Sequence, residues 1–415
     1  MLRRHLHEIA IDHGCVGFGV TSADPFDGVA ATMQERKTAG LSADLAFTYR
    51  DPSIAADVRR TFPWAERLVA VAFAYEPDAG ASAQAPGALR IARFADGDRY
   101  LGLRDALNAL VVELESADAR AVALSDDSRL VDRAVAVRAG VGWWGRSTMV
   151  LVPGPGPWVL LGSIATDAAL EVDDPMPRTC GTCTACIPAC PTGAILDNGV
   201  LDVRLCLAYH LQSPGVIPRN LRNAVADRLY GCDDCLTSCP PGSRVFDAAA
   251  SVQGPTILDV LGATDADLLD RYGHFYLPAR RPRILRRNAL VAAGNDRSPE
   301  LEPVVVGYLG HPDWVLRVHA AWAILQYETE LGRAAIERAL GEEPDGRVRR
   351  ELLGSDEPPS RNPGLRLGDG IRDARLAGCG ECAFWRRSEA MPMLIVSDVH
   401  GAAEPLRRVA SLGEP

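Results

Sequence analysis

The distribution of apolar and polar positions predicts strands in the first part of the chain and helices in the last part. Continuous apolar runs at 68–75 (LVAVAFAY) and 158–166 (WVLLGSIAT) are typical of buried strands. Residues 98–116 carry apolar side chains at helical spacing, and residues 285–353 have a helical, weakly repetitive pattern. These elements indicate an α+β fold whose N-terminal region mixes helices and strands.

Two helical segments share one motif. HPDWVLRVHAAWAIL (311–325) and EPDGRVRRELL (343–353) each place a Pro-Asp turn before a helix that contains Val and Arg. Asp313 and Asp345 are about 32 positions apart, a spacing that suits stacked helix pairs of the HEAT type. A plain helical bundle is the alternative.

Eight of the eleven cysteines lie between residues 171 and 245, a region that is rich in proline and short connections. The segment CGTCTACIPACPTGAI (180–195) has the spacing Cys-x2-Cys-x2-Cys-x3-Cys-Pro. This run is the signature of a bacterial-type ferredoxin, in which three thiolates bind one [4Fe–4S] cluster and the fourth binds a second cluster. The spacing therefore requires a second group of ligands.

That second group is present in GCDDCLTSCPPG (231–242), and RLCLAYH (204–210) offers one further cysteine. We assign Cys180, Cys183, Cys186 and Cys239 to cluster one, and Cys190, Cys206, Cys232 and Cys235 to cluster two. Two structural zinc sites are the alternative, but zinc does not require this spacing. Paired clusters of this kind transfer single electrons.

The composition and the N-terminal segment indicate the class of protein and its cellular compartment. Apolar residues make up 47% and charged residues 24% of the chain, as in ordinary globular proteins. No apolar run reaches the ~18 residues of a membrane-spanning helix, and the N-terminal MLRRHLHEIAIDHG does not resemble a signal peptide. We expect a cytoplasmic protein without membrane contact, in which cysteines act as metal ligands rather than in disulfides.

A net charge of −10 argues against bulk attraction to nucleic acid and leaves room for a local basic patch. The best candidate is ARRPRILRRN (279–288), with five arginines in eight positions. Arg317, Arg347, Arg349 and Arg350 would extend it. A solvated helix face is the plain alternative.

Several segments together resemble the epoxyqueuosine reductase family. They are SDDSRLVDRAVAVRAGVGWWGRSTMVLV (125–152), the first cysteine run, RLCLAYH, DRLYGCDDC and ILRRNALVAAGN (284–295), in the family's order over residues 1 to about 353. The resemblance implies a cobalamin cofactor, two [4Fe–4S] clusters and a tRNA anticodon stem-loop that carries epoxyqueuosine at the wobble position. It also implies an external electron donor, and we expect a monomer.

The resemblance implies four domains: a cobalamin-binding α/β domain (1–170), a ferredoxin-like double-cluster module (171–250), a helical HEAT-like tRNA-binding region (251–353) and a tail (354–415). In the tail, MPMLIVSDVHG (391–401) resembles the first strand of a metallophosphoesterase, with Asp398 and His400 as would-be ligands. Because the remaining ligands of such a site are missing, we interpret the tail as a linker followed by a truncated fragment.

The family's proton donor corresponds to Asp126, which would need an apolar surrounding to stay protonated at neutral pH. Asp127 lies beside it, and Asp132 is the next candidate. The resemblance implies cobalamin contacts from Asp126, Arg133, Arg146 and Thr148. The chain departs from the family where Arg146-Ser147 replaces Lys-Asn, at Ala55 and at Leu101.

Two other functions compete with this interpretation. A related corrinoid and iron–sulfur reductase of another small molecule would share the cofactors. A non-catalytic electron-transfer protein would share only the cysteine module.

Overall fold

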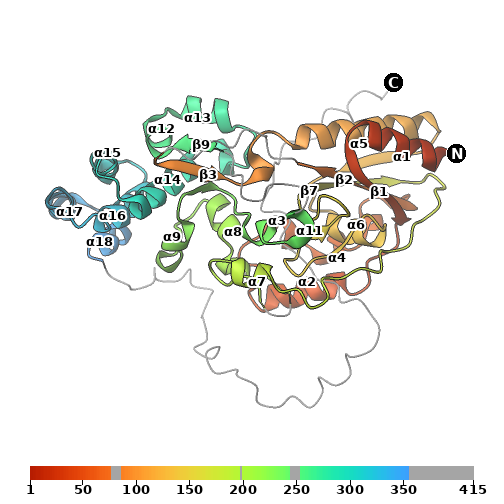
Figure 1. Ribbon diagram of the computed structural model, residues 1–415, viewed down its shortest axis with the longest axis horizontal. Helices are drawn as coiled ribbons and strands as arrows, with labels where there is room; N and C mark the ends of the chain where they lie inside the picture. The colour runs from red at the N-terminus through yellow and green to blue at the C-terminus, as the bar shows by residue number, and fades with distance from the viewer. Residues whose placement is uncertain (76–85, 197–198, 244–252, 355–415) are drawn as a thin grey trace, which may run out of the picture.

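The computed structural model describes residues 1–75, 86–196, 199–243 and 253–354. Figure 1 shows an elongated molecule with the large sheet at one end and helices α15 to α18 at the other. The cysteine-rich segment lies between them. The predicted phosphoesterase-like segment and its Asp398 and His400 lie outside the described residues.

A four-stranded antiparallel sheet forms the core of the N-terminal region, in the order β1-β2-β7-β4. Its strands are β1 (Cys15–Ser22), β2 (Arg67–Ala74), β7 (Val159–Thr166) and β4 (Ala121–Leu124). The two apolar runs that predicted buried strands are the central pair, β2 and β7. Both faces of these strands are covered, which explains why their sequences are apolar throughout rather than alternating.

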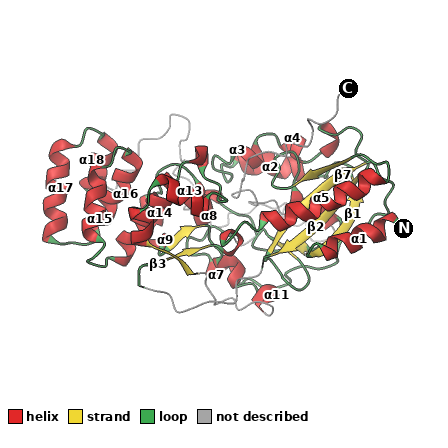
Figure 2. Cartoon of the chain, turned by 90° about the horizontal axis from the view of Figure 1, so that it is seen from above, coloured by secondary structure: helices red, strands yellow, loops and turns green. Residues whose placement is uncertain are grey.

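Helices cover the two faces of this sheet. On one face, Val69, Val71 and Ile164 pack with α1 (Leu2–Asp12) and α5 (Tyr100–Ser116), which lie alongside each other in Figure 2. On the other face, Leu68, Ala70 and Ala165 pack with α2 (Val29–Thr38) and α6 (Asp132–Arg138). Gly162 lets α5 approach β7, because a Cβ there would lie 2.8 Å from Cδ1 of Leu107.

The cysteine-rich segment is built from short elements. They are α7 (Cys186–Ala189), η3 (Val203–Leu205), α8 (Leu207–Gln212), α9 (Arg219–Val225), β8 (Arg228–Tyr230), α10 (Asp234–Thr237) and α11 (Pro240–Ser243). In a second sheet, β3 (Ala88–Ile91) lies between β8 and β9 (Gln253–Thr256). A strand from the N-terminal region therefore joins the cysteine-rich segment to the helices that follow.

The C-terminal region is helical, as predicted. Its helices are α12 (Ile257–Gly262), α13 (Asp265–Tyr272), η4 (Pro278–Arg280), α14 (Arg283–Asp296), α15 (Glu302–Gly307), η5 (Tyr308–Gly310), α16 (Trp314–Leu325), α17 (Glu330–Glu342) and α18 (Gly346–Leu352). Asp313 caps α16 and Asp345 caps α18, each by accepting a hydrogen bond from the backbone two residues on. The repeated Pro-Asp turn thus begins two stacked helices.

The remaining elements are short: α3 (Ala46–Tyr49), α4 (Pro52–Ala55), η1 (Val58–Arg60), η2 (Arg93–Ala95), β5 (Trp143–Trp144) and β6 (Val150–Leu151). Within the described residues, no helix is both long and apolar enough to cross a membrane.

Candidate active site and cluster-binding module

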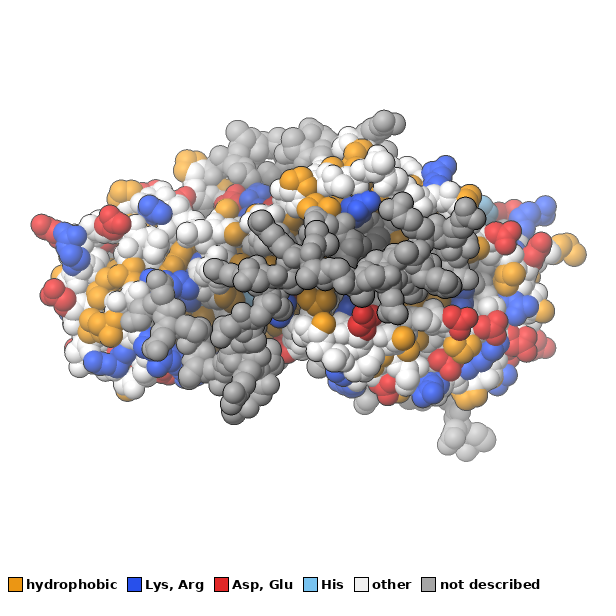
Figure 3. Space-filling view, turned by 90° about the horizontal axis from the view of Figure 1, so that it is seen from below, with side chains coloured by type: hydrophobic (Ala, Val, Ile, Leu, Met, Phe, Trp, Pro, Cys, Tyr) orange, Lys and Arg blue, Asp and Glu red, His pale blue; other side chains and the backbone are white. Residues whose placement is uncertain are grey.

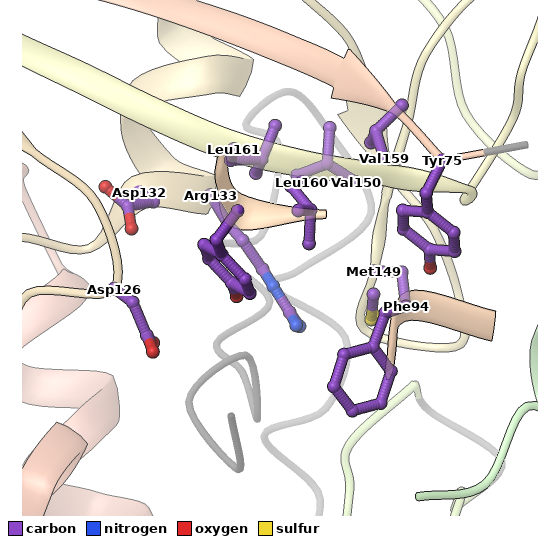
Figure 4. Close-up of a pocket in the computed structure, with 11 residues that line it drawn as sticks. Tyr75, Phe94, Asp126, Asp132, Arg133, Met149, Val150, Val159, Leu160 and Leu161 are labelled. Atoms are coloured by element: carbon purple, nitrogen blue, oxygen red, sulfur yellow. The ribbon is translucent and has the colours of Figure 1, made fainter. Parts of the chain in front are cut away.

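A cavity opens between the start of β7 and the loop that follows β4. Apolar side chains form most of its wall, and three charged side chains join them: Asp126, Asp132 and Arg133. In the view of Figure 4, Asp126 and Asp132 lie on the side opposite Tyr75 and Phe94, with Arg133 between them. The predicted proton donor therefore faces a largely apolar space.

Asp126 is held in an unusual backbone conformation two residues after β4 ends. Its φ of 53° lies in the left-handed region, which Asp tolerates better than most residues. The neighbouring Asp127 is fixed by Arg129, whose Nε and Nη2 donate to the carboxylate at 2.9 and 2.5 Å. The two adjacent carboxylates thus have different settings: Asp126 lines the cavity, whereas Asp127 is part of an ion pair.

Arg133 and Thr148, both expected to contact cobalamin, lie together. Arg133 is 3% exposed, and its Nη1 donates to the backbone oxygen of Thr148 at 2.5 Å. Thr148 is 1% exposed and has a φ of 70°. A turn closed by the hydrogen bond from its N–H to the oxygen of Gly145 holds it there, at 2.9 Å.

A second cavity adjoins the first. The two share the walls formed by Tyr75, Phe94, Arg133 and Met149. The four predicted ligands of cluster two line it: Cys190, Cys206, Cys232 and Cys235. Burial raises the pKa of Cys235 well above its usual value, and the nearby sulfurs of Cys232, Cys206 and Cys190 raise it further.

The other four cysteines gather around Cys239. Burial raises the pKa of Cys239 to about 12, with smaller contributions from Cys180, Cys186 and Cys183. The segment that carries Cys180 to Cys190 contacts the segment that carries Cys232 to Cys239 through helices α7 and α10. The structure therefore brings together the same two sets of four thiols that the spacing predicts, including the exchange of Cys190 and Cys239 between runs.

The arrangement of the described thiols can be compared with the geometry of a single-ion site. In a tetrahedral zinc site, Zn–S bonds of ~2.3 Å hold the sulfurs about 3.8 Å apart. Among the described residues, no three His, Cys, Asp or Glu side chains converge on a point that one metal ion could occupy. A [4Fe–4S] cubane differs from such a site because it binds each thiolate at a separate iron atom.

Arg146 lies beside the first cysteine loop. Its backbone N–H donates to Sγ of Cys180 at 3.2 Å, and its Nη2 donates to the oxygen of Gly181 at 3.2 Å. It does not line either of the two cavities described above. The two other family departures are structurally distinct, since Ala55 is buried and Leu101 is exposed.

Sequence reasoning missed Tyr75, Phe94 and Asp233. The first two separate the cavities, and they come from distant parts of the chain without a recognisable motif. Removal from water raises the pKa of Asp233 to about 6, although the backbone N–H of Arg93 donates to it at 2.6 Å. Its place in the CDDC segment was the only available signal.

The expected arginine patch at 280–287 is largely wrong. Arg287 is 1% exposed and bound to backbone oxygens, Arg286 pairs with Asp265, and Arg283 pairs with Asp313. Of the five arginines in this segment, Arg280 and Arg281 are the two that are exposed. The patch fails because α14 is buried on almost every side, so its arginines satisfy neighbouring chain segments.

Three of the four arginines in the proposed extension of that patch also bind neighbouring groups of the chain. Arg317 forms an ion pair with Glu343, and Arg347 with Asp345. Arg349 donates to the oxygen of Leu340. On the face shown in Figure 3, Lys and Arg side chains are interspersed with Asp and Glu at both ends of the molecule. This face therefore has no extended surface of positive charge alone among the described residues.

Comparison with known proteins explains these features. Residues 179–242 match the family described as a 4Fe-4S double cluster binding domain, and residues 278–355 match HEAT repeats. The epoxyqueuosine reductase of Bacillus cereus is 30% identical over 348 residues, which are 80% of this chain and 91% of that protein. That of Staphylococcus aureus is 30% identical over 85% of this chain and 95% of its own. This chain belongs to the epoxyqueuosine reductase family.

Solved structures of the family agree with this assignment. An epoxyqueuosine reductase with a tRNA-Tyr epoxyqueuosine-modified stem loop is 29% identical, with 85% of this chain and 97% of that chain covered and a TM-score of 0.79. The Bacillus subtilis enzyme with its catalytic aspartate loop swung out of the active site gives the same values. The predicted α+β fold, double-cluster domain and HEAT repeats are confirmed.

Proposed function

We propose that this chain reduces epoxyqueuosine to queuosine at the wobble position of tRNA, with cobalamin and two [4Fe–4S] clusters. One observation carries the proposal. The cavity that contains Asp126 shares its wall with the cavity of the cluster-two thiols, through Tyr75, Phe94, Arg133 and Met149. Electrons and a proton can therefore reach one space from two sides.

The cluster ligands follow from the grouping of the thiols. Cluster one takes Cys180, Cys183, Cys186 and Cys239, and cluster two takes Cys190, Cys206, Cys232 and Cys235. Cluster two is the inner one, because its thiols share a cavity wall with the reaction space, whereas Cys183 is exposed. An external electron donor would then deliver electrons at cluster one.

The residues that line the two cavities would hold the cobalamin. Met149, Val159, Leu160 and Leu161 would offer it an apolar surface. Arg133, bound to the oxygen of Thr148, offers a buried cation between the two cavities. When bound, cobalamin would supply a strong nucleophile or one-electron donor at its cobalt. The protein's part is to exclude water, hold the substrate and deliver protons.

Asp126 is the proposed proton source. Removal of an epoxide oxygen as water, with formation of a C=C bond, consumes two electrons and two protons. The departing oxygen needs a proton as its C–O bonds break, and general acid catalysis of such a step is worth ~10²–10⁴ in rate. Asp126 lines the cavity and would have to be protonated to act as an acid, whereas Asp127 is bound by Arg129 and does not line the cavity.

For tRNA, the support comes from Arg280 and Arg281. Both are exposed, whereas Arg283 and Arg286 of the same segment are paired with Asp313 and Asp265. They follow Tyr276, which is 37% exposed and lines a small cavity that shares Phe94 and Tyr100 with the reaction space. Arginine contacts to phosphate position a nucleic acid without reading its sequence. We propose a cytoplasmic monomer that binds the stem-loop here.

Nucleoside analysis tests the function directly. In a host whose own epoxyqueuosine reductase gene is deleted, tRNA accumulates epoxyqueuosine, and expression of this chain should convert it to queuosine. Unchanged epoxyqueuosine, despite full cluster and cobalamin content, would contradict the proposed substrate.

A further inference from the structure

Arg287 and Asn288 form a buried polar pair that the proposed reaction does not use. They lie on α14 and are 1% and 0% exposed. The Arg287 guanidinium donates to the backbone oxygens of His210 at 2.7 Å and Gly215 at 2.6 Å, and also to that of Ser213. A buried cation therefore binds main-chain oxygens near the end of α8.

Asn288 connects α8 with a second chain segment. Its Oδ1 accepts from Nε and Nη2 of Arg287 at 3.0 and 2.8 Å, which fixes the orientation of the amide. Its Nδ2 then donates to the oxygen of Leu211 at 2.8 Å and to that of Leu229 at 2.7 Å. The side chain thus joins the end of α8 to strand β8.

Each of these segments leads to a cysteine that lines the inner cavity. Cys206 is the residue immediately before α8, and Cys232 follows two residues after β8 ends. A further bond joins the same segments, from the Tyr230 hydroxyl to Oε1 of Gln212 at 3.1 Å. The segments that lead to Cys206 and Cys232 are therefore joined both directly and through contacts made by α14.

The residue types suit this task. Carbonyls in the last turn of a helix lack partners within that helix and carry its negative dipole end, so they favour a buried cation. Arginine presents five donors in a planar fork, whereas lysine presents three on one atom. Burial lowers the pKa of Arg287 to about 9, so the guanidinium remains charged at neutral pH.

We infer that Arg287 and Asn288 are positioning residues for cluster two, which hold the chain segments of Cys206 and Cys232 at the spacing that a cubane requires. The inference rests on the ligand assignment proposed above. It gives the first helix of the HEAT region a specific part in assembly of the inner cluster. The hydrogen bonds of Arg287 and Asn288 given above reach no residue of the loop that carries Cys180, Cys183 and Cys186, so we expect cluster one to form without them.

Iron and sulfide analysis of the full chain after anaerobic reconstitution tests this inference. Asn288→Ala and Arg287→Met should each lower iron from about eight to about four atoms per chain. Arg287→Lys should restore part of the loss, because it keeps the charge and some of the donors. Iron near eight in both Asn288→Ala and Arg287→Met would overturn the inference.

Cysteine backgrounds identify which cluster is lost. In Cys206→Ala, where only cluster one can form, adding Asn288→Ala should cost no further iron. In Cys183→Ala, where only cluster two can form, adding Asn288→Ala should remove most of the remaining iron. The opposite pattern, or full iron in Cys206→Ala alone, would overturn the inference. Because no substrate is involved, these outcomes are independent of the proposed tRNA activity.

A matched control separates positioning from general loss of stability. Glu302 is a buried polar residue of α15 that accepts a hydrogen bond from Thr329 within the repeats. Glu302→Gln should lower the melting temperature and leave iron near eight. If Glu302→Gln lost as much iron as Asn288→Ala at a similar melting temperature, the effect would be unspecific and the inference would fail.

Discussion

Two nitrogens of Arg129 donate hydrogen bonds to the carboxylate of Asp127, while the adjacent Asp126 lines the cavity in which we propose that the reaction occurs. This difference separates the roles of two neighbouring, chemically identical side chains. Asp127 is engaged in its ion pair with Arg129, whereas Asp126 faces the space in which we propose that the epoxide binds. A general acid must lie within reach of the group that it protonates.

Asp126→Asn should therefore retain both clusters and bind tRNA, yet turn over epoxyqueuosine ~10²–10⁴ times more slowly. The amide keeps the size of the side chain and cannot supply a carboxylic proton, so the loss should appear in kcat rather than KM. Single-turnover assays with synthetic epoxyqueuosine stem-loop would measure it.

Asp127→Asn is the matched control, and it should lose far less activity. Asp132 lines the same cavity and accepts a hydrogen bond from Ser163 at 3.3 Å, which makes it the alternative donor rather than a neutral control. Turnover of Asp126→Asn within a few-fold of wild type, together with a large loss in Asp132→Asn, would transfer the role to Asp132.

The crossed arrangement of ligands predicts a distinctive result for Cys239 and Cys190. Cys232→Ala should eliminate cluster two and leave about four iron atoms. Adding Cys239→Ala to this background should remove that iron as well, because Cys239 belongs to the cluster of the first run. Adding Cys190→Ala should cost nothing more.

If each run instead kept its own cluster, the two double variants would give the reverse result. Iron and sulfide analysis distinguishes the outcomes. Recovery of two zinc ions and no iron from the wild-type protein would contradict both arrangements.

The spacing within each cysteine run could be interpreted from sequence because its determinants are local. Three thiols on one tight loop cap one face of a cubane, and the Cys-Pro bond directs the fourth thiol away. The capping role of Asp313 and Asp345 is similarly local, since each bonds to a backbone N–H two residues on. Such features need no knowledge of distant chain segments.

The arginine segment could not be interpreted in this way. Arg281 and Arg287 look alike in sequence, yet one is exposed and the other is enclosed by residues about 75 positions earlier in the chain. Tyr75 and Phe94 meet between the cavities for the same kind of reason: the sheet and the cysteine module bring them there. Tertiary packing, rather than local pattern, decides these positions.

The Asp345 cap should make stability depend on pH. Hydrogen bonding from Arg347 lowers the pKa of Asp345 to about 2, compared with ~3.9 in an unfolded chain. A carboxylate with a lowered pKa stabilises the folded state above the unfolded value, and this contribution is lost as pH falls from about 4 toward 2. Asp345→Asn keeps an acceptor and loses the charge.

Asp345→Asn should therefore be less stable than wild type at pH 7, by about 0.2–1 kcal/mol for a partly exposed ion pair. Urea unfolding at several pH values should show the difference shrinking below pH 4. Exposed Asp270, on α13, provides the control substitution Asp270→Asn. A difference that stayed constant between pH 7 and pH 3 would contradict the assigned role.

The last prediction concerns the RNA surface, which the structure reduces to Arg280 and Arg281. Reversing both charges, in Arg280→Glu with Arg281→Glu, should weaken tRNA binding and leave iron content near eight. Each lost phosphate contact should reduce the slope of log K against log salt by about 0.7–0.9, so the double variant should lose up to about twice that amount.

Arg297→Glu is the matched control, because Arg297 is exposed at the opposite end of α14. Fluorescence anisotropy with a labelled anticodon stem-loop at several salt concentrations would measure the slopes. Equal slopes for wild type and the Arg280/Arg281 double variant would place the RNA on another surface, whereas a reduced slope for Arg297→Glu alone would place it at the far end of α14.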